Sequence, residues 1–217
     1  MRGKAVVVAT GVQYRRLPIE RLADFEGAGV YYAATENEAR FCKGSATVVI
    51  GGGNSAGQAA MFLSRAATHV HVLVRGPSLA TSMSNYLSSR LDADPAITLS
   101  YSAEVVALHG DETLEAVTVR NAVDGSEQRI DTCALFVMVG AAPNTHWLSG
   151  LVALDDKGFI LTGDAAGADS PYATSHPGIF AVGDVRAGSV KRVASSVGEG
   201  SVVISKVWDY VNRRTAA

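Results

Sequence analysis

The chain of 217 residues is long enough for one large domain or two of about 100 residues each, and its 47% hydrophobic and 18% charged content is typical of a compact α/β protein. A formal net charge of -2, with no run of more than two Lys or Arg, argues against a nucleic acid or an acidic membrane as partner. No apolar stretch is long enough to cross a bilayer, and two cysteines are too few for a disulfide framework, which favours a reduced, cytoplasmic protein.

The first apolar run, at residues 5–8, is shorter than the core of a signal peptide and predicts a buried strand. From residue 46 to 140, short β-branched runs alternate with helical patterns, which predicts βαβ units and a parallel sheet. The expected elements are a strand at 47–50, a helix at 55–67, a strand at 70–74 and a helix at 79–91.

The next segments predict an accessory β-meander and a second domain. Strand patterns separated by turn residues occur at 97–101, 104–108, 114–121 and 128–131, and another buried strand is expected at 134–139. Strands at 159–161 and 179–182 and a helix from Val193 to about Arg213 complete the chain. Because both ends of the chain have a strand that runs into a glycine, we expect a domain at 17–140 inserted between two pieces, 1–16 and 141–217, of a second domain.

The turn after the strand at 47–50 contains the candidate cofactor residues Gly51, Gly52, Gly53, Asn54, Ser55 and Ala56. In a dinucleotide fold the first Gly allows a tight turn, the second lets the backbone approach the pyrophosphate, and a third small residue packs the helix on the sheet. Gly51, Gly53 and Ala56 occupy these positions, and the helix start supplies free N–H groups. The turn predicts a nicotinamide-dinucleotide site, with a purely structural glycine turn as the alternative.

The residue at the end of the second strand selects between NAD and NADP. An acidic residue there bonds the ribose 2′-hydroxyl of NAD, whereas arginine accommodates the 2′-phosphate of NADP. Arg75 stands at this point with no acid nearby, and Ser78 adds a hydroxyl. These residues favour NADP, the alternative being a solvated arginine at a strand end.

Four motifs in the same order along nearly the whole chain resemble the thioredoxin reductase family of flavin-dependent pyridine nucleotide-disulfide oxidoreductases. They are Ala9-Thr10-Gly11 at a strand end, residues 50–56, residues 137–144 with Gly140 at their centre, and residues 178–184. The resemblance implies an α/β fold with a Rossmann-like three-layer NADPH domain, the accessory β-meander and the C-terminal part of a FAD-binding domain.

The same resemblance implies roles for residues near the C-terminus. Gly183 and Asp184 match the family's second flavin motif, in which the Asp bonds the ribitol. Arg192, Val193 and Ala194 match the segment beside the flavin ring, where the start of a helix favours a reduced, anionic flavin.

The family's redox pair, Cys-x-x-Cys, is missing from this chain. The matching stretch is Ala33-Ala34-Thr35-Glu36, so dithiol exchange with thioredoxin by the family mechanism is not expected. Cys42 has no partner at that spacing and Cys133 precedes a buried strand, so both are expected to be inert small hydrophobes.

The family's first FAD pyrophosphate loop also has no counterpart, because the chain begins at the Ala-Thr-Gly strand. We therefore expect a C-terminal piece of a longer product, or a subunit completed by another chain that carries the N-terminal FAD-binding half. The resemblance implies NADPH as a ligand, FAD for the completed protein, and a homodimer as one of the oligomeric states left open.

Two functions from different classes stay open at this point. One is an oxidoreductase that passes a hydride from NADPH to FAD and electrons onward to an acceptor that the chain does not identify. The other is a non-catalytic NADP(H)-binding or regulatory module. No catalytic side chain and no metal site are predicted: His69 and His71 alternate on one strand, but they lack a third ligand.

Overall fold

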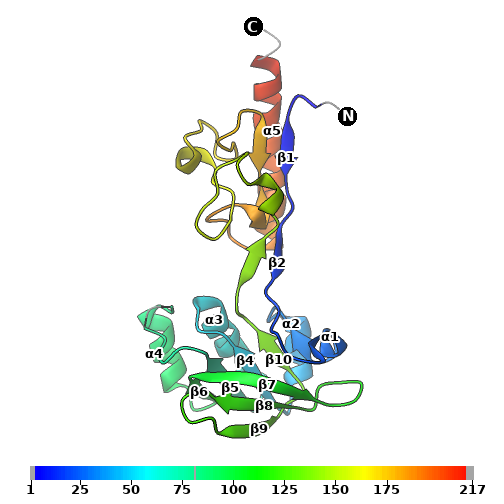
Figure 1. Cartoon of the computed structure of the whole chain (residues 1–217), viewed down its shortest axis with the longest axis vertical. Coiled ribbons are helices and arrows are strands. Elements are labelled where there is room, and N and C mark those ends of the chain that lie inside the picture. Colours follow the sequence, from blue (N-terminus) through cyan, green and yellow to red (C-terminus); the bar gives the residue numbers. More distant parts are fainter. Residues whose placement is uncertain (1–2, 81, 214–217) are drawn as a thin grey trace. The chain divides into compact units, whose positions relative to one another are not determined.

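The computed structural model describes residues 3–80 and 82–213, and it contains two compact units (Figure 1). Unit 1 comprises Met1–Tyr14 and Ala141–Ala217, and unit 2 comprises Arg15–Gly140. Residues 17–140, expected as an inserted domain, all lie within the residue range of unit 2. No helix among the described residues combines the length and the hydropathy that crossing a membrane would demand.

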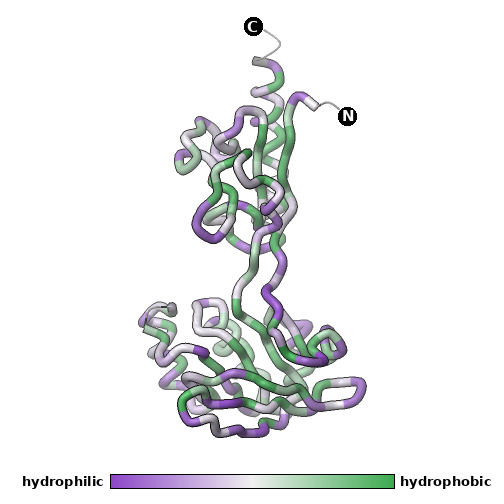
Figure 2. Tube along the Cα trace, viewed as in Figure 1, coloured by the Kyte–Doolittle hydropathy of each residue, from purple (hydrophilic) through white to green (hydrophobic). Residues whose placement is uncertain are grey.

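The centre of unit 2 is a five-stranded parallel sheet in the order β3-β10-β4-β5-β6. Its inner strands consist largely of aliphatic residues, and Val48, Val49, Val70 and Val72 are fully buried, as expected for a parallel sheet covered on both faces (Figure 2). The predicted α/β class is thereby confirmed. The strands are β3 (Val30–Tyr31), β4 (Ala46–Ile50), β5 (His69–Val74), β6 (Ile97–Tyr101) and β10 (Leu135–Val137).

Two layers cover this sheet (Figure 1). On one face α3 (Asn54–Leu63) and α4 (Asn85–Ala93) pack their apolar sides against Val70, Val72 and Val74. On the other face an antiparallel sheet of β7 (Ala103–His109), β8 (Ala116–Asn121) and β9 (Glu127–Asp131) buries Val117 and Val119 against Val48 and Leu73. Before β4 lie the short helices α1 (Leu22–Phe25) and α2 (Glu36–Ala39) and the 3-10 turn η1 (Arg40–Cys42).

Several predicted elements of unit 2 differ from the structure, among them the strand expected at 134–139, which ends at Val137. The helix expected at 79–91 begins only at Asn85, because Ser82 Oγ donates to the carbonyl oxygen of Gly52 (2.7 Å) and the Ser84 N–H donates to Asn54 Oδ1 (2.9 Å). These bonds hold the preceding segment against the glycine turn. The helix expected at 55–67 ends at Leu63. The strand at 97–101, assigned to the meander, is β6 and pairs in parallel with β5.

Unit 1 contains two separate strand pairs and one long helix. β1 (Val6–Val8) pairs in parallel with β12 (Ile179–Ala181), and β2 (Val12–Tyr14) pairs antiparallel with β11 (Ala141–Pro143). The helix predicted from Val193 is confirmed as α5 (Val193–Arg213), which packs Val203, Val207 and Tyr210 on Phe180 and Val182. Short 3-10 turns occur at η2 (His146–Leu148), η3 (Gly163–Ala166) and η4 (Gly183–Val185).

The strand expected at 159–161 is wrong. Ile160 forms single bridges with Leu154 and Arg186 but no continuous ladder. Unit 1 also leaves apolar side chains exposed: Val6 is 51% accessible on β1, and along α5 Val197, Ile204 and Trp208 are each at least 66% accessible.

Candidate functional site

Loops after β4, β5 and β10 meet at the carboxyl edge of the parallel sheet of unit 2. Gly51 follows β4 with φ of +145°, and its N–H donates to the Leu73 carbonyl of β5 (3.0 Å). A Cβ at Gly51 would lie 2.5 Å from the carbonyl oxygen of Met138, just beyond β10. Only glycine therefore allows this strand to turn between its two neighbours.

The turn leads directly into the N-terminus of α3. Gly57 N–H donates to the Gly53 carbonyl (3.1 Å), so the N–H groups of Asn54, Ser55 and Ala56 precede the helical ladder and are not used by it. The Ala56 side chain is fully buried between helix and sheet, as expected for the third small position. A Cβ at Gly53 would have no heavy atom closer than 3.8 Å, so the backbone here is open to a ligand.

Arg75 and Ser78 follow β5 at the same edge, and both are exposed. Within the described part of the chain the Arg75 guanidinium makes no hydrogen bond or ion pair. Gly140, after β10, has φ of +89° and no heavy atom within 4 Å of the position of a Cβ. The structure thus brings the glycine turn, Arg75 and Gly140 to one edge with open space beside two of the glycines.

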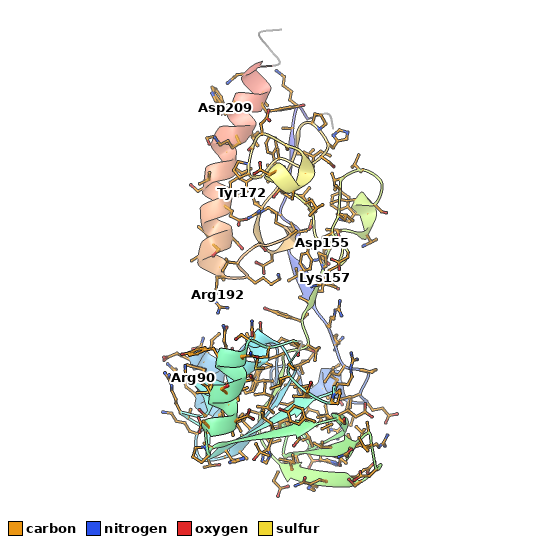
Figure 3. The ribbon with its side chains drawn as sticks, turned by 90° about the vertical axis from the view of Figure 1, so that its left-hand side faces the viewer. Arg90, Asp155, Lys157, Tyr172, Arg192 and Asp209 are labelled. Carbon is orange, nitrogen blue, oxygen red and sulfur yellow. The ribbon has the colours of Figure 1, made fainter. Side chains whose placement is uncertain are left out.

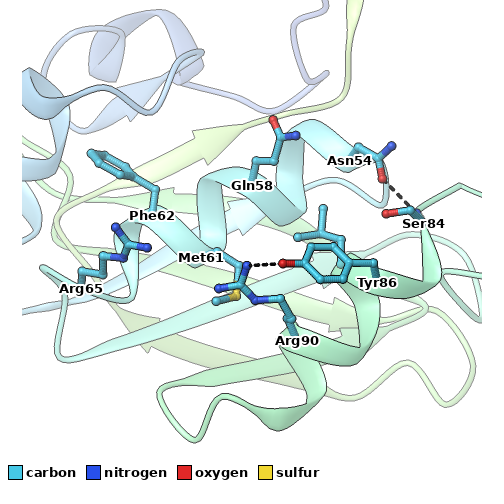
Figure 4. Close-up of a pocket in the computed structure, with 9 residues that line it drawn as sticks. Asn54, Gln58, Met61, Phe62, Arg65, Ser84, Tyr86 and Arg90 are labelled. Carbon is cyan, nitrogen blue, oxygen red and sulfur yellow. Dashed lines mark hydrogen bonds between the residues drawn. The ribbon is translucent and has the colours of Figure 1, made fainter.

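A cavity of about 340 Å³ lies on the helical side of unit 2, between α3 and α4 (Figure 4). Of the predicted turn residues only Asn54 lines it, and its side chain holds Ser84 at the start of α4. The other end contains two exposed arginines, Arg65 and Arg90, and Arg90 donates to the Tyr86 hydroxyl (3.1 Å). The sequence did not predict this cavity, because the true start of α4 depends on a contact with a distant turn.

In unit 1 the residues predicted for a flavin lie at η4 and the start of α5. Gly183 has φ of +74°, and the hydroxyl of Ser196 donates to Asp184 Oδ1 (3.4 Å). Arg192, Val193 and Ala194 are exposed where α5 begins, and Figure 3 shows Arg192 at this end of the helix. The structure therefore brings the η4 turn against the first turns of α5.

An ion pair that sequence reasoning missed fixes the η4 turn to α5. Arg186 donates through Nη2 to Glu199 Oε1 (2.6 Å) and through Nε to Oε2 (3.2 Å), and Gly183 N–H donates to the same Oε2 (2.6 Å). Both side chains are mostly buried, at 18% and 13% accessibility. Arg186 also donates to Thr162 Oγ1 (3.1 Å) and lies over the Tyr172 ring.

The electrostatics of this pair favour the ionised carboxylate. Burial alone raises the pKa of Glu199, but the hydrogen bonds from Arg186 and from the Gly183 N–H outweigh it, so the pKa lies below the usual 4.5. No signal in the sequence identifies the pair, because its partners come from a turn and from the second turn of a helix beyond it.

At the stretch that replaces the Cys-x-x-Cys pair, Thr35 is the N-cap of α2. Its hydroxyl accepts from the Asn37 N–H and also bonds the Glu38 carboxylate, which accepts from the Thr35 N–H in a capping box. Elsewhere in unit 2, His69 and His71 lie edge to face at 4.8 Å, and His69 bonds the Thr98 hydroxyl. Across 3–80 and 82–213 no group of three His, Cys, Asp or Glu side chains is arranged to hold a metal.

Comparison with known proteins gives consistent matches over almost the whole chain. A thioredoxin reductase of Streptomyces clavuligerus is 35% identical over 199 residues, which cover 92% of this chain and 59% of the relative. An NADH dehydrogenase of Bacillus subtilis is 31% identical over 98% of this chain and 40% of its own length. The crystal structure of a Streptococcus pyogenes thioredoxin reductase matches with a TM-score of 0.77 and 28% identity over 96% of this chain and 66% of that one.

The chain thus spans between about two fifths and three fifths of the length of these curated relatives. The family model described as pyridine nucleotide-disulphide oxidoreductase matches residues 1–200. The chain therefore belongs to the pyridine nucleotide-disulphide oxidoreductases, a family of flavoproteins that bind FAD and NAD(P).

Proposed function

We propose that unit 2 binds NADP(H) and that the chain is the hydride-delivering part of a flavoprotein oxidoreductase. The observation that carries this proposal is the open N-terminus of α3 beside the unpaired Arg75, at one edge of the parallel sheet. The helix N-terminus suits the pyrophosphate of the cofactor, and Arg75 suits its 2′-phosphate. A purely structural glycine turn would not require, at the end of the adjacent strand, an exposed cation that has no partner among the described residues.

The residues of unit 2 fit the cofactor group by group. The N–H groups of residues 54–56 and the positive end of the α3 dipole suit the pyrophosphate, which the backbone of Gly53 is open to approach. Arg75 and Ser78 supply a cation and a hydroxyl for the 2′-phosphate. At Gly140 no heavy atom lies within 4 Å of the position of a Cβ, so the backbone there is also open to the cofactor.

For unit 1 we propose a partial FAD site at η4 and the start of α5. Asp184 supplies a carboxylate for the ribitol hydroxyls, and the N-terminus of α5 places a positive dipole end where a reduced flavin would carry negative charge. FAD, when bound, accepts the hydride of NADPH. The ion pair of Arg186 and Glu199 orients the turn that carries Asp184, with Gly183 N–H committed to the carboxylate.

We propose that another segment, the N-terminal FAD-binding half or another chain, completes this site. The greater length of the relatives and the exposed apolar residues of β1 and α5 support this proposal. The electron acceptor is not a disulfide engaged at residues 33–36, where this chain has no thiol. That replacement also favours a second candidate, a non-catalytic NADP(H)-binding module.

The substitution Arg75→Glu tests the nucleotide assignment. We expect the Kd for NADPH, measured by calorimetry, to rise by about 10- to 100-fold and the Kd for NADH to change little, since only NADPH has the 2′-phosphate. Arg129→Glu, another exposed arginine of unit 2 but on β9 of the accessory sheet, is the matched control and should leave both constants unchanged. An equal loss of affinity for the two nucleotides, or no loss for either, would overturn the role of Arg75.

A spectroscopic test separates the enzyme from the module. The chain, together with the segment or chain that completes the FAD site, is incubated with FAD, desalted and mixed with NADPH under nitrogen. Retained flavin absorbance that bleaches with NADPH supports the oxidoreductase. A colourless protein that still binds NADPH supports the module.

A further inference from the structure

The two cysteines of the chain are neighbours in unit 2, although 90 residues separate them in the sequence. Cys42 ends η1 and is fully buried, whereas Cys133 lies in the loop before β10 and is half-buried. The Cys133 thiol donates to the carbonyl oxygen of Phe41 (3.0 Å). That oxygen belongs to the peptide group that contains the Cys42 nitrogen, so the Cys133 sulfur lies against the backbone of Cys42.

Two hydroxyl groups connect the cysteines on either side. Ser45 Oγ lies 3.0 Å from Cys133 Sγ and donates to the Cys42 carbonyl (3.4 Å). Thr47 Oγ1 lies 3.5 Å from Cys42 Sγ and donates to the carbonyl of Ala134, the residue after Cys133 (3.0 Å). Each thiol therefore touches a side chain that also bonds the backbone at or beside the other cysteine.

We propose that Cys42 and Cys133 form a disulfide within the chain when unit 2 meets a small disulfide oxidant such as oxidised glutathione. This modification site goes beyond the proposed nucleotide and flavin binding and does not depend on either. It also departs from the expectation that both cysteines are inert small hydrophobes.

The exchange takes place in two steps. The Cys133 thiolate attacks the oxidant, whose S–S bond breaks to release one glutathione thiolate and leave a mixed disulfide on Cys133. The Cys42 thiolate then attacks Cys133 Sγ and releases the second glutathione. Two protein thiols are oxidised, one glutathione disulfide is reduced to two thiols, and the two protein protons pass to the glutathione thiolates.

The burial of the two groups sets the order of these steps. Cys133 reaches the surface and is attacked first, whereas Cys42 is sealed from an external oxidant and reacts only with its neighbour. Burial raises the pKa of the Cys42 thiol, and the hydrogen bond with Thr47 partly opposes that rise. The Cys42 thiol is therefore less readily ionised than an exposed thiol, and its reaction relies on the proximity of Cys133.

The new bond would link η1 to the strand that borders the glycine turn. β10 begins two residues after Cys133, and its Val137 pairs with Ile50, the residue before Gly51. A disulfide would thus fix the start of a strand whose far end contacts the candidate nucleotide site.

The test uses the full 217-residue chain, reduced, freed of reductant and incubated with oxidised glutathione before alkylation. Intact mass spectrometry should show a monomer that has taken up no alkylating group. Its mass should be about 2 Da below that of the reduced, unalkylated chain. Proteolysis without reductant should give one linked peptide pair that contains residues 42 and 133. A persistent mixed disulfide on Cys133, a dimer linked between chains, or two unreacted thiols would each overturn the proposal.

Two single variants distinguish the roles of the thiols. Cys42→Ser should stop at the glutathione adduct on Cys133, because the resolving thiol is gone. Cys133→Ser should stay reduced, because Cys42 is inaccessible, and rapid modification of this variant would contradict the proposed order. Far-UV circular dichroism checks that both variants fold, and the wild-type mass alone decides whether the disulfide forms.

Discussion

Unit 2 and unit 1 both contain parallel strands, but they bury them differently. In unit 2 the five-stranded sheet lies between two helices and a second sheet, so its inner strands are covered on both faces. Among the described residues of unit 1 no further strand joins the parallel pair β1–β12, and Val6 and Val7 remain exposed. Because parallel pairing is normally stable only when both faces are covered, we expect unit 1, whose two buried apolar clusters are smaller, to depend more on specific polar contacts than unit 2.

The two units can be followed separately in solution. Both tryptophans of the chain, Trp147 and Trp208, belong to unit 1. Tryptophan fluorescence therefore reports the unfolding of unit 1, and far-UV circular dichroism reports both units. Variants followed by these two signals can therefore show whether unit 1 depends on its ion pair and unit 2 on its backbone geometry.

The largest effect is expected for Arg186→Met, which leaves the Glu199 carboxylate buried without its partner. Loss of one member of a buried pair typically costs about 3–5 kcal/mol, so we expect the tryptophan transition to move by about 3 kcal/mol in urea. Arg192→Met, an exposed arginine of the same unit, is the control. An unchanged tryptophan transition in Arg186→Met would refute the dependence of unit 1 on this pair.

The second-largest loss of stability is expected for Gly51→Ala, in unit 2. The new Cβ would meet the Met138 backbone oxygen at 2.5 Å, and φ of +145° is unfavourable for alanine, so we expect a loss of about 2–3 kcal/mol. The circular dichroism transition should shift while the tryptophan transition stays in place. Gly76→Ala, where the Cβ has only ordinary contacts, should change neither.

A smaller loss of stability is expected when the pH is lowered, because acid protonates Glu199 but leaves its side chain in place. Because the pKa of Glu199 is lowered in the folded protein, its contribution to stability is fully present above about pH 4.5 and is lost as the pH falls through that lowered value. The difference in stability between wild type and Glu199→Gln, read by tryptophan fluorescence, should therefore shrink below pH 4.5. A difference that does not vary with pH would contradict the lowered pKa.

The smallest effect is expected for Thr35→Ala, which removes the N-cap of α2. Loss of such a cap typically costs about 0.5–2 kcal/mol, and because α2 is short and exposed we expect about 0.5 kcal/mol, confined to unit 2. Thr35→Ser retains the hydroxyl and should restore most of the loss in the dichroism transition. A loss that serine does not restore would assign the effect to the methyl group and not to the cap.

The sequence predicted best those features that depend on neighbouring residues. The strands β4 and β5 and the glycine turn follow from local apolar runs and from residues that only a tight turn requires. The start of α5 at Val193 was also predicted. In each case the deciding residues lie within one or two elements of each other.

Features that depend on distant contacts could not be predicted. The start of α4 is displaced to Asn85 by bonds from Ser82 and Ser84 to the glycine turn, and the apolar pattern of 79–84 does not reveal them. The pair of Arg186 and Glu199 and the approach of Cys133 to Cys42 both join segments whose proximity only the fold establishes. The residues 159–161 have the composition of a strand but no adjacent ladder to join.

The insertion of unit 2 into unit 1 also implies an order of folding. Val6 of β1 pairs with Ile179 of β12, and the whole of unit 2 lies between them in the sequence. Closing so long a loop from an unfolded chain carries an entropy cost that grows with the logarithm of its length. Once unit 2 has folded, Arg15 N–H bonds the Gly140 carbonyl (3.0 Å), and its two ends are already together. During synthesis β1 therefore stays unpaired until β12 has been made. A folded unit 2 then lowers the entropy cost of bringing the two strands together.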